Sequence, residues 1–245
     1  FPHLTVRENI AFGLKGLSRN AKNDRIAELL DIIALSELEN RYPHQLSGGQ
    51  AQRVALVRAV APKPRVLLLD EPFNNLDVGL RFRLLHDVER LIRTERTSAI
   101  MVTHDWQEAF AISDRIAIMN EGKILQIGAP REVYEHPRSR YVAEFFGPLN
   151  ELPENAQELL CIRPRDVVLS TRTDEVCPNC LTYRGVVAER RFLGEYQEIR
   201  CELLNGNRIE NRRSITAYAP AHVTIGEGDT VIAACPKEWL LRFSA

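Results

Sequence analysis

The sequence predicts an α/β domain followed by a small, OB-like β-barrel, and three observations lead to this fold class. The apolar run Val66-Leu67-Leu68-Leu69 stops at two carboxylates, as a fully buried parallel strand does. Segments with apolar residues at helical spacing precede and follow this run. After Gly147-Pro148 the helix signals fade, and short β-rich runs replace them. We therefore expect a first domain at residues 1–147 and a second at 148–245.

Composition bounds the class of protein. The 245 residues suffice for one large or two small domains with ample core. A hydrophobic content of 44% and a charged content of 27% are typical of a soluble globular protein. The net charge of −1 gives no electrostatic reason to expect a nucleic acid or an anionic membrane surface as partner. No stretch approaches the ~20 apolar residues that span a bilayer. Five cysteines, an odd number, suit a reducing compartment, so we expect a cytoplasmic protein.

The first helices are predicted from a capping signal and from periodicity. Thr5 followed by Glu8 forms a capping box, which predicts a helix from Val6. Residues 21–38 form an amphipathic helical region. Its apolar positions are Ile26, Leu29, Leu30 and Ile33, and its expected solvent-facing residues are Arg25, Glu28 and Asp31.

The next helix begins at a stretch suited to phosphate, Leu46-Ser47-Gly48-Gly49-Gln50. Ser47 is a good N-cap residue, and the two glycines allow the backbone to approach a ligand closely. A helix N-terminus carries unpaired N–H groups and partial positive charge, so it suits a polyphosphate. The helix is expected to end near Ala61. Arg53 and Arg58 lie on it within reach of phosphate, although solvation is the simpler role for Arg58.

Charged residues follow two predicted strands. Asp70 and Glu71 end the first strand, and His104 follows the second, Ala99 to Val102. Ligands bind at the carboxyl ends of strands in open α/β sheets. A carboxylate there can hold Mg²⁺ through its water shell, and its neighbour can accept a proton from an attacking water. Helices are expected at 78–93 and 105–113, the second with Trp106, Ala109 and Phe110 on one side.

Together these stretches resemble the ATP-binding-cassette (ABC) ATPase family. Leu46 to Gln50 matches its signature motif, and Val66 to Glu71 matches Walker B plus the catalytic glutamate. Asn74-Asn75-Leu76-Asp77 lies where the D-loop belongs, and His104 where the switch histidine belongs. Asn74-Asn75 replaces the small pair usual in the family, so we expect altered kinetics rather than loss of activity.

The resemblance implies a role for each of these residues. Asp70 would hold Mg²⁺ through water, Glu71 would be the general base, and His104 would bond the γ-phosphate of ATP and orient the attacking water. The signature residues of one cassette cap the ATP held by another, and Asp77 contacts that partner. The signature residues here are Ser47, Gly48, Gly49 and Gln50.

A phosphate-binding motif of the form G-x-x-x-x-G-K-[ST] does not occur in this sequence. We therefore expect the chain to be the C-terminal part of a P-loop NTPase (ABC) domain with its helical subdomain, inactive by itself and with exposed apolar sheet edges. The alternative is a non-hydrolytic regulatory or remnant cassette. Because Asp70, Glu71 and His104 are all present, we favour part of an active enzyme.

The second domain resembles the transport-associated OB (TOBE) domain of ABC importers. Ile162-Arg163-Pro164-Arg165-Asp166-Val167 is close to its I-R-P-E-D motif, with Arg165 in place of the usual glutamate. Strands are expected at 159–163, 167–170, 181–189, 196–204 and 230–234, and short strands separated by turn signals favour a small barrel.

Cys177-Pro178-Asn179-Cys180 has the spacing of half a metal site or of a redox pair. Cys201, Cys235 or His222 could complete a zinc site. Alternatively, the cysteines are small buried hydrophobic residues.

The resemblance therefore implies an importer ATPase that binds ATP and Mg²⁺ and couples hydrolysis to uptake of ferric iron, polyamine, sulfate or sugar. It also implies a homodimer of cassettes on the inner face of the membrane. The implied partners are transmembrane permease subunits, which residues 1–9 could contact, and, indirectly, a solute-binding protein. A further alternative is an ABC ATPase of DNA repair or translation. The barrel motif and the absence of a basic stripe count against this alternative.

Overall fold

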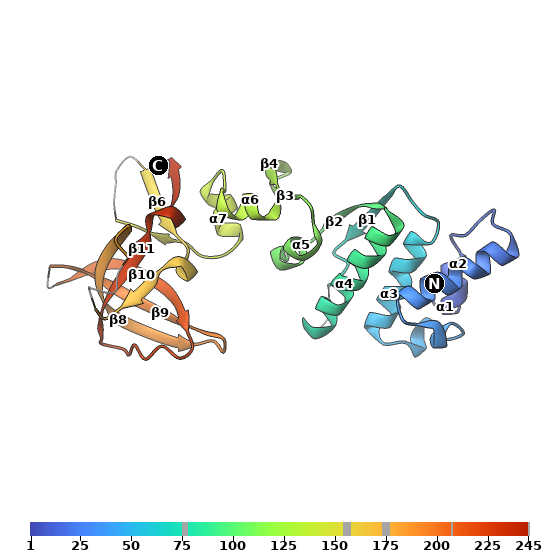
Figure 1. Ribbon diagram of the computed structural model, residues 1–245, viewed down its shortest axis with the longest axis horizontal. Coiled ribbons are helices and arrows are strands. Elements are labelled where there is room, and N and C mark those ends of the chain that lie inside the picture. Colours follow the sequence, from blue (N-terminus) through green and yellow to red (C-terminus); the bar gives the residue numbers. More distant parts are fainter. Residues whose placement is uncertain (75–77, 154–157, 173–176, 207, 245) are drawn as a thin grey trace. The chain divides into compact units, whose positions relative to one another are not determined.

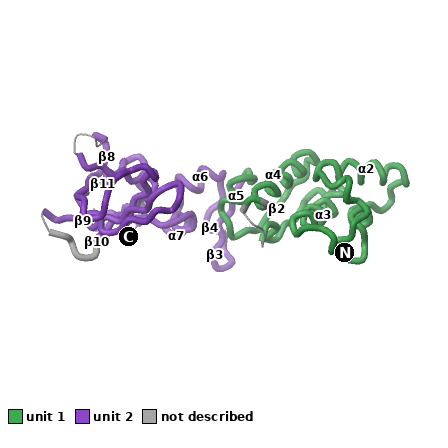
Figure 2. Tube along the Cα trace, turned by 90° about the horizontal axis from the view of Figure 1, so that it is seen from below, with its two compact units in different colours: residues 1–114 green, residues 115–245 purple. Residues whose placement is uncertain are grey.

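The computed structural model describes residues 1–74, 78–153, 158–172, 177–206 and 208–244 (Figure 1). The chain divides into two compact units, Phe1–Asp114 and Arg115–Ala245 (Figure 2). The predicted boundary near Gly147 lies inside the second unit and stays a prediction. Among the described residues, no helix has the length and apolar character needed to cross a membrane.

Unit 1 is mainly helical, with one pair of parallel strands. Its α-helices are α1 (Val6–Ala11), α2 (Arg19–Ile32), α3 (Gly48–Val60), α4 (Val78–Glu95) and α5 (Trp106–Ile112). Short 3₁₀ turns lie at Ser36–Leu38 and Pro43–Gln45. Its strands are β1 (Val66–Asp70) and β2 (Ser98–Val102).

The helix starts of unit 1 follow from local sequence. Thr5 and Glu8 form the predicted capping box of α1, and the Ser18 side chain accepts a hydrogen bond from Ala21 N at the start of α2. The predicted inward faces then meet in one core, where α1 packs on α3 and α3 on α4. This core includes Val6, Ile10, Ile26, Leu29, Leu30, Val57, Val60, Leu84 and Leu91.

Arg25 corrects the predicted solvent face of α2, because its side chain is only 7% exposed. Nη1 lies 2.6 Å from Oε1 of Glu95, whose side chain is 4% exposed, and 2.9 Å from Oε2 of Glu28. Nε donates to the Ala61 carbonyl at 3.4 Å. Burial alone would lower the pKa of the Arg25 guanidinium, but the hydrogen bonds to Glu95 and Glu28 raise it above its ordinary value. The arginine therefore joins α2 to the ends of α3 and α4.

The strand β1 is not fully buried, contrary to the prediction. It pairs in parallel with β2 alone among the described residues, in the register Leu68↔Ile100 and Asp70↔Val102. Leu67 faces the helical core, whereas Leu68 is 73% exposed and Ile100 and Val102 are also exposed. Side chains alternate across a strand, so one face of this pair is covered by helices and the other is open.

Unit 2 begins with a hairpin and two short helices and continues into β-structure. The hairpin is β3 (Ile116–Asn120) and β4 (Lys123–Gly128), and the helices are α6 (Pro130–Glu135) and α7 (Arg140–Phe145). The remaining strands are β5 (Asn150–Glu151), β6 (Glu158–Ile162), β7 (Val168–Ser170), β8 (Cys180–Phe192), β9 (Tyr196–Asn205), β10 (Arg208–Pro220), β11 (Thr230–Pro236) and β12 (Leu241–Ser244). Short 3₁₀ turns lie at Pro164–Asp166 and Lys237–Trp239.

The strands of unit 2 form a curled sheet in the order β10-β9-β8-β11-β7 and a smaller sheet in the order β12-β6-β5 (Figure 1). The five predicted strands are confirmed, within a few residues at their ends. The sequence did not predict β10, which pairs antiparallel with β9 from Ser214↔Glu202 to Pro220↔Tyr196. The first half of the strand is rich in charged and polar residues, which are weak signals for a strand.

The I-R-P motif follows β6 of the smaller sheet and contacts the two short helices α6 and α7. Arg163 is buried, its guanidinium lies 4.1 Å from the ring centroid of Tyr134, and it donates to the carbonyls of Ala143 and Tyr134. Burial lowers the pKa of Arg163 and raises the pKa of the nearby Asp166 carboxyl. The motif that marked the domain in the sequence therefore serves as an internal anchor of unit 2.

Candidate functional site

The carboxyl ends of β1 and β2 place the predicted catalytic residues at one edge of unit 1. The parallel register pairs Asp70 with Val102, so Glu71 and the segment after Val102 leave the sheet side by side. Glu71 N donates to the Val102 carbonyl at 2.9 Å, which extends the pairing by one bond. The strand register therefore brings Glu71 and His104 together at this edge.

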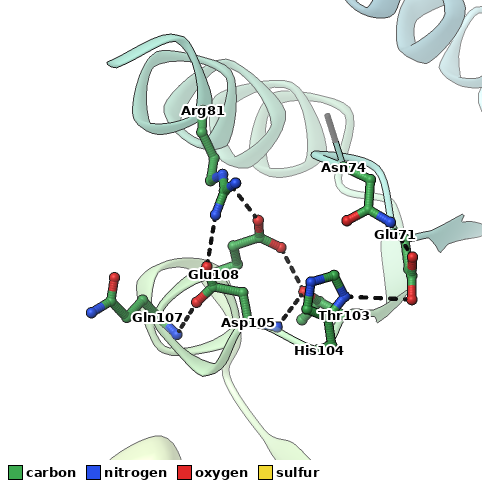
Figure 3. Close-up of polar contacts among 8 residues, drawn as sticks. All are labelled: Glu71, Asn74, Arg81, Thr103, His104, Asp105, Gln107 and Glu108. Carbon is green, nitrogen blue, oxygen red and sulfur yellow. Dashed lines mark hydrogen bonds and ion pairs between the residues drawn. The ribbon is translucent and has the colours of Figure 1, made fainter. Parts of the chain in front are cut away.

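Glu71 and His104 face each other across this edge (Figure 3). Glu71 Oε1 lies 3.5 Å from His104 Nδ1, and Asn74 Nδ2 donates to the other carboxylate oxygen. Both side chains are exposed, His104 at 71%, so a ligand can reach them. Glu71 has a φ of 43°, a left-handed conformation that is uncommon outside glycine and often found at functional sites. The turn therefore aims the carboxylate back toward the end of β2.

A further set of polar side chains surrounds the backbone of His104, and the sequence analysis did not predict it. Glu108 is the buried residue of α5, and the prediction had named Trp106, Ala109 and Phe110 as residues on one side of this helix. Its carboxylate accepts a hydrogen bond from Thr103 Oγ1 at 2.6 Å and lies 3.6 Å from Arg81 Nε (Figure 3). An acidic residue in the first turn of a helix is common, so the sequence carried no signal that this one is buried.

The signature stretch begins α3 as predicted. Ser47 Oγ accepts a hydrogen bond from Gln50 N at 3.3 Å, and Gln50 Oε1 accepts one from Ser47 N at 2.9 Å, which completes a capping box. Gly49 is buried, whereas Gly48 is exposed and a side chain there would meet nothing within 4 Å. The first turn of α3 therefore presents open backbone to solvent.

Arg53 and Arg58, which were predicted to lie within reach of phosphate, contact other protein side chains. Arg53 Nε lies 2.9 Å from Asp87 Oδ2, so it joins α3 to α4 and is not free to reach phosphate. Arg58 lies 4.3 Å over the Phe1 ring and donates to Asn9. Asp70 is exposed at the end of β1, and Asp77 lies outside the described residues.

Among the described residues, the cysteines are not gathered into a candidate metal site. Cys177 and Cys180 are joined as a disulfide, and a disulfide sulfur is not a thiolate ligand. Cys201 and Cys235 are buried in different apolar clusters, and His222 is exposed. Within the described ranges, no group of three or more His, Cys, Asp or Glu side chains could hold a metal. The redox alternative for the pair stays a prediction.

Thiol reactivity tests this arrangement. Burial raises the pKa of the Cys161 and Cys201 thiols to about 11, so their reactive thiolate forms are suppressed at neutral pH. We expect no rapid maleimide labelling of the native oxidised protein and labelling of Cys177 and Cys180 after mild reduction. Replacing both by serine should abolish that labelling. Rapid labelling of three thiols before reduction, or stoichiometric zinc in protein purified without chelator, would contradict the assignment.

Comparison with known proteins identifies two known families of domain in the chain. The sequence profile described as ABC transporter matches residues 1–74, and that described as TOBE domain matches residues 160–243. The chain is 39% identical over 234 residues to the sulfate/thiosulfate import ATP-binding protein CysA of Thermosynechococcus vestitus, covering 91% of this chain and 68% of that protein. It is 35% identical over 280 residues to the Fe(3+) ions import ATP-binding protein FbpC 2 of Rhizobium meliloti, covering 100% and 70%.

A third relative aligns with less of the chain. The spermidine/putrescine import ATP-binding protein PotA of Pseudomonas fluorescens is 52% identical over 155 residues, which are 62% of this chain and 43% of that protein. The chain belongs to the ABC transporter family and, within it, to the ATP-binding subunits of importers, which couple ATP hydrolysis to solute uptake. This membership supports the importer interpretation and not the regulatory-module alternative.

Proposed function

We propose that Glu71 and His104 form the hydrolytic part of an ATP site, with Glu71 as general base and His104 as the group that bonds the γ-phosphate and orients the attacking water. The observation that carries this proposal is the 3.5 Å approach of their side chains at the carboxyl edge of β1 and β2. An exposed carboxylate can accept a proton from water, and an imidazole N–H can donate to a phosphate oxygen. Both groups lie within two residues of a strand end, which suits positioning for phosphoryl transfer.

Asp70 is the residue we assign to Mg²⁺. Its carboxylate is exposed next to Glu71, and hard oxygen ligands with retained waters are those that Mg²⁺ prefers. When bound, Mg²⁺ would neutralise charge on the β- and γ-phosphates. Asp70 would hold the ion through a water, which leaves Glu71 free to act on the nucleophile.

The start of α3 is assigned to the ATP bound by a second cassette. Ser47, Gly48, Gly49 and Gln50 would cap that nucleotide, and two cassettes of this chain would form a homodimer with ATP between them. Support comes from the exposed backbone at Gly48 and the positive end of the α3 dipole, both suited to a polyphosphate. Asp77 would contact the partner cassette.

The same proposal extends to the transporter. The subunit would act at the inner face of the membrane with permease subunits, and through them with a solute-binding protein. The names of the relatives point to sulfate or thiosulfate, ferric iron or a polyamine as the class of solute, and a sugar was also expected from the resemblance.

Substitution of Gly48→Asp in the full-length protein tests the role of α3. An acidic residue in the first turn favours a helix, so the fold should be retained. The new carboxylate would repel a triphosphate at the same place. We expect ATP-dependent dimerisation to be lost and ATP hydrolysis to fall about a hundredfold, comparable to losing a donor to a reacting oxyanion. Light scattering and a phosphate-release assay measure the two effects.

Ser18→Asp provides the matched control, because it adds the same charge at the start of α2 without touching the proposed site. It should leave dimerisation and hydrolysis unchanged. If Gly48→Asp behaves like Ser18→Asp, the start of α3 does not bind nucleotide.

A further inference from the structure

Thr103, the residue before His104, is held by a hydrogen-bond relay that the catalytic assignment does not use. Its hydroxyl donates to Glu108 Oε2 at 2.6 Å and accepts from Asp105 N at 3.0 Å. The Thr103 hydroxyl thus bridges the α5 carboxylate and the peptide that follows His104 (Figure 3). Both neighbours of His104 are fixed by this one side chain.

Arg81 on α4 completes the relay from the other side. Its Nη1 donates to Asp105 Oδ2 at 2.8 Å, and its Nε lies 3.6 Å from Glu108 Oε1. Asp105 Oδ1 also accepts from Gln107 N at 2.9 Å, which caps α5. One guanidinium therefore contacts two carboxylates, that of the N-cap residue Asp105 and that of Glu108 in the first turn of α5.

His104 itself has little to hold it. Its side chain is 71% exposed, and within the described part of the chain its polar contact is with Glu71. The direction of its Cα–Cβ bond is therefore set by the backbone of Thr103 and Asp105, the two residues that the relay restrains. A shift of about 1 Å in a reacting group can cost about a hundredfold in rate.

Burial of Glu108 is costly, which argues for a role beyond filling space. Its side chain is 6% exposed, although a buried ion pair is often no more stabilising than an apolar residue of similar size. Such pairs contribute geometric specificity when every lone pair is used. Here the two carboxylate oxygens go to different partners, Thr103 and Arg81.

We propose that Glu108, together with Thr103 and Arg81, is a positioning residue that orients the His104 backbone for ATP hydrolysis. The inference rests on the proposed function of His104. Glu108 does not touch the reacting atoms and acts only through the Thr103–Asp105 segment.

The test is a set of variants of the full-length protein assayed for ATP hydrolysis. Glu108→Gln removes the charge that attracts Arg81, and Thr103→Val removes the hydroxyl that bonds Glu108 and Asp105 N. Each substitution should lower kcat for ATP hydrolysis about tenfold, because the His104 side chain is then displaced. The KM for ATP should stay within about twofold, since the phosphate contacts elsewhere are unchanged. Thr103→Ser keeps the hydroxyl and should restore kcat. Amide hydrogen exchange at Asp105 should be faster in Thr103→Val.

The same variants in a His104→Ala background separate positioning from general stability. If Glu108 acts through His104, Glu108→Gln should cause no further loss of kcat there. An equal fold-loss in both backgrounds overturns this inference and leaves the role of His104 intact. Unchanged kcat in His104→Ala alone overturns the proposed function and the inference with it. Arg93→Met is the matched control, because it breaks the exposed pair with Glu89 on α4, the helix that carries Arg81. It should change neither kcat nor the KM for ATP.

Discussion

Replacing Glu71 by glutamine in the full-length protein is expected to reduce kcat for ATP hydrolysis by about a thousandfold, within the range that a positioned general base contributes. The amide keeps the shape of the side chain but cannot accept a proton from water. ATP should still bind, because the proposed phosphate contacts of α3, Asp70 and His104 remain. The variant should therefore accumulate as an ATP-bound dimer, detectable by size-exclusion chromatography with bound nucleotide.

Glu121→Gln is a matched control for this experiment. Glu121 is also an exposed glutamate with a left-handed backbone, at φ 48°, but it lies in the β3–β4 turn. The same chemical change there should leave hydrolysis unaffected. Full turnover by Glu71→Gln would show that another group activates the water.

Arg25→Met is expected to cost about 3–5 kcal/mol in the free energy of unfolding, the cost of leaving one member of a buried ion pair unpaired. Glu95 would remain 4% exposed without its 2.6 Å partner, and the Ala61 carbonyl would lose its donor. Lys63, 3.9 Å from Glu95, is exposed and restores little of the lost interaction. Urea unfolding followed by Trp106 fluorescence would report the loss within unit 1.

Two further variants make this result specific to the pair. Arg25→Met combined with Glu95→Leu removes both charges and should recover most of the lost stability, because an apolar pair can replace a buried ion pair. Arg93→Met breaks the exposed pair with Glu89 on α4 and should have a small effect. If Arg25→Met unfolds no more easily than Arg93→Met, the Arg25–Glu95 contact does not stabilise the fold.

Local contacts explain which predictions were confirmed. The capping boxes Thr5–Glu8 and Ser47–Gln50 join residues three apart, so the sequence alone specifies them. The strand ends at Asp70 and before Thr103 were also correct, since apolar runs stop where polar residues begin.

Burial was harder to predict, because it depends on residues far away in the chain. Leu68 lies in an apolar run that predicts a core residue, but its side chain is exposed, because helices cover only one face of its strand. Arg25 reads as a surface residue of α2, yet Glu95, 70 positions later, holds it inside. The strand β10 was missed because its pairing with β9 outweighs the weak strand propensity of its polar first half.

The protein family, the helix capped by Ser47 and the presence of Glu71 and His104 at two strand ends could all be predicted from the sequence. Each of these depends on residue type and short-range spacing. The folded chain was needed to show that Glu71 and His104 lie 3.5 Å apart, that Glu108 is buried against Thr103 and Arg81, and that Cys177 and Cys180 form a disulfide. The physical reason is that strand register, helix packing and side-chain burial are set by partners distant in the sequence or by the path of the folded chain.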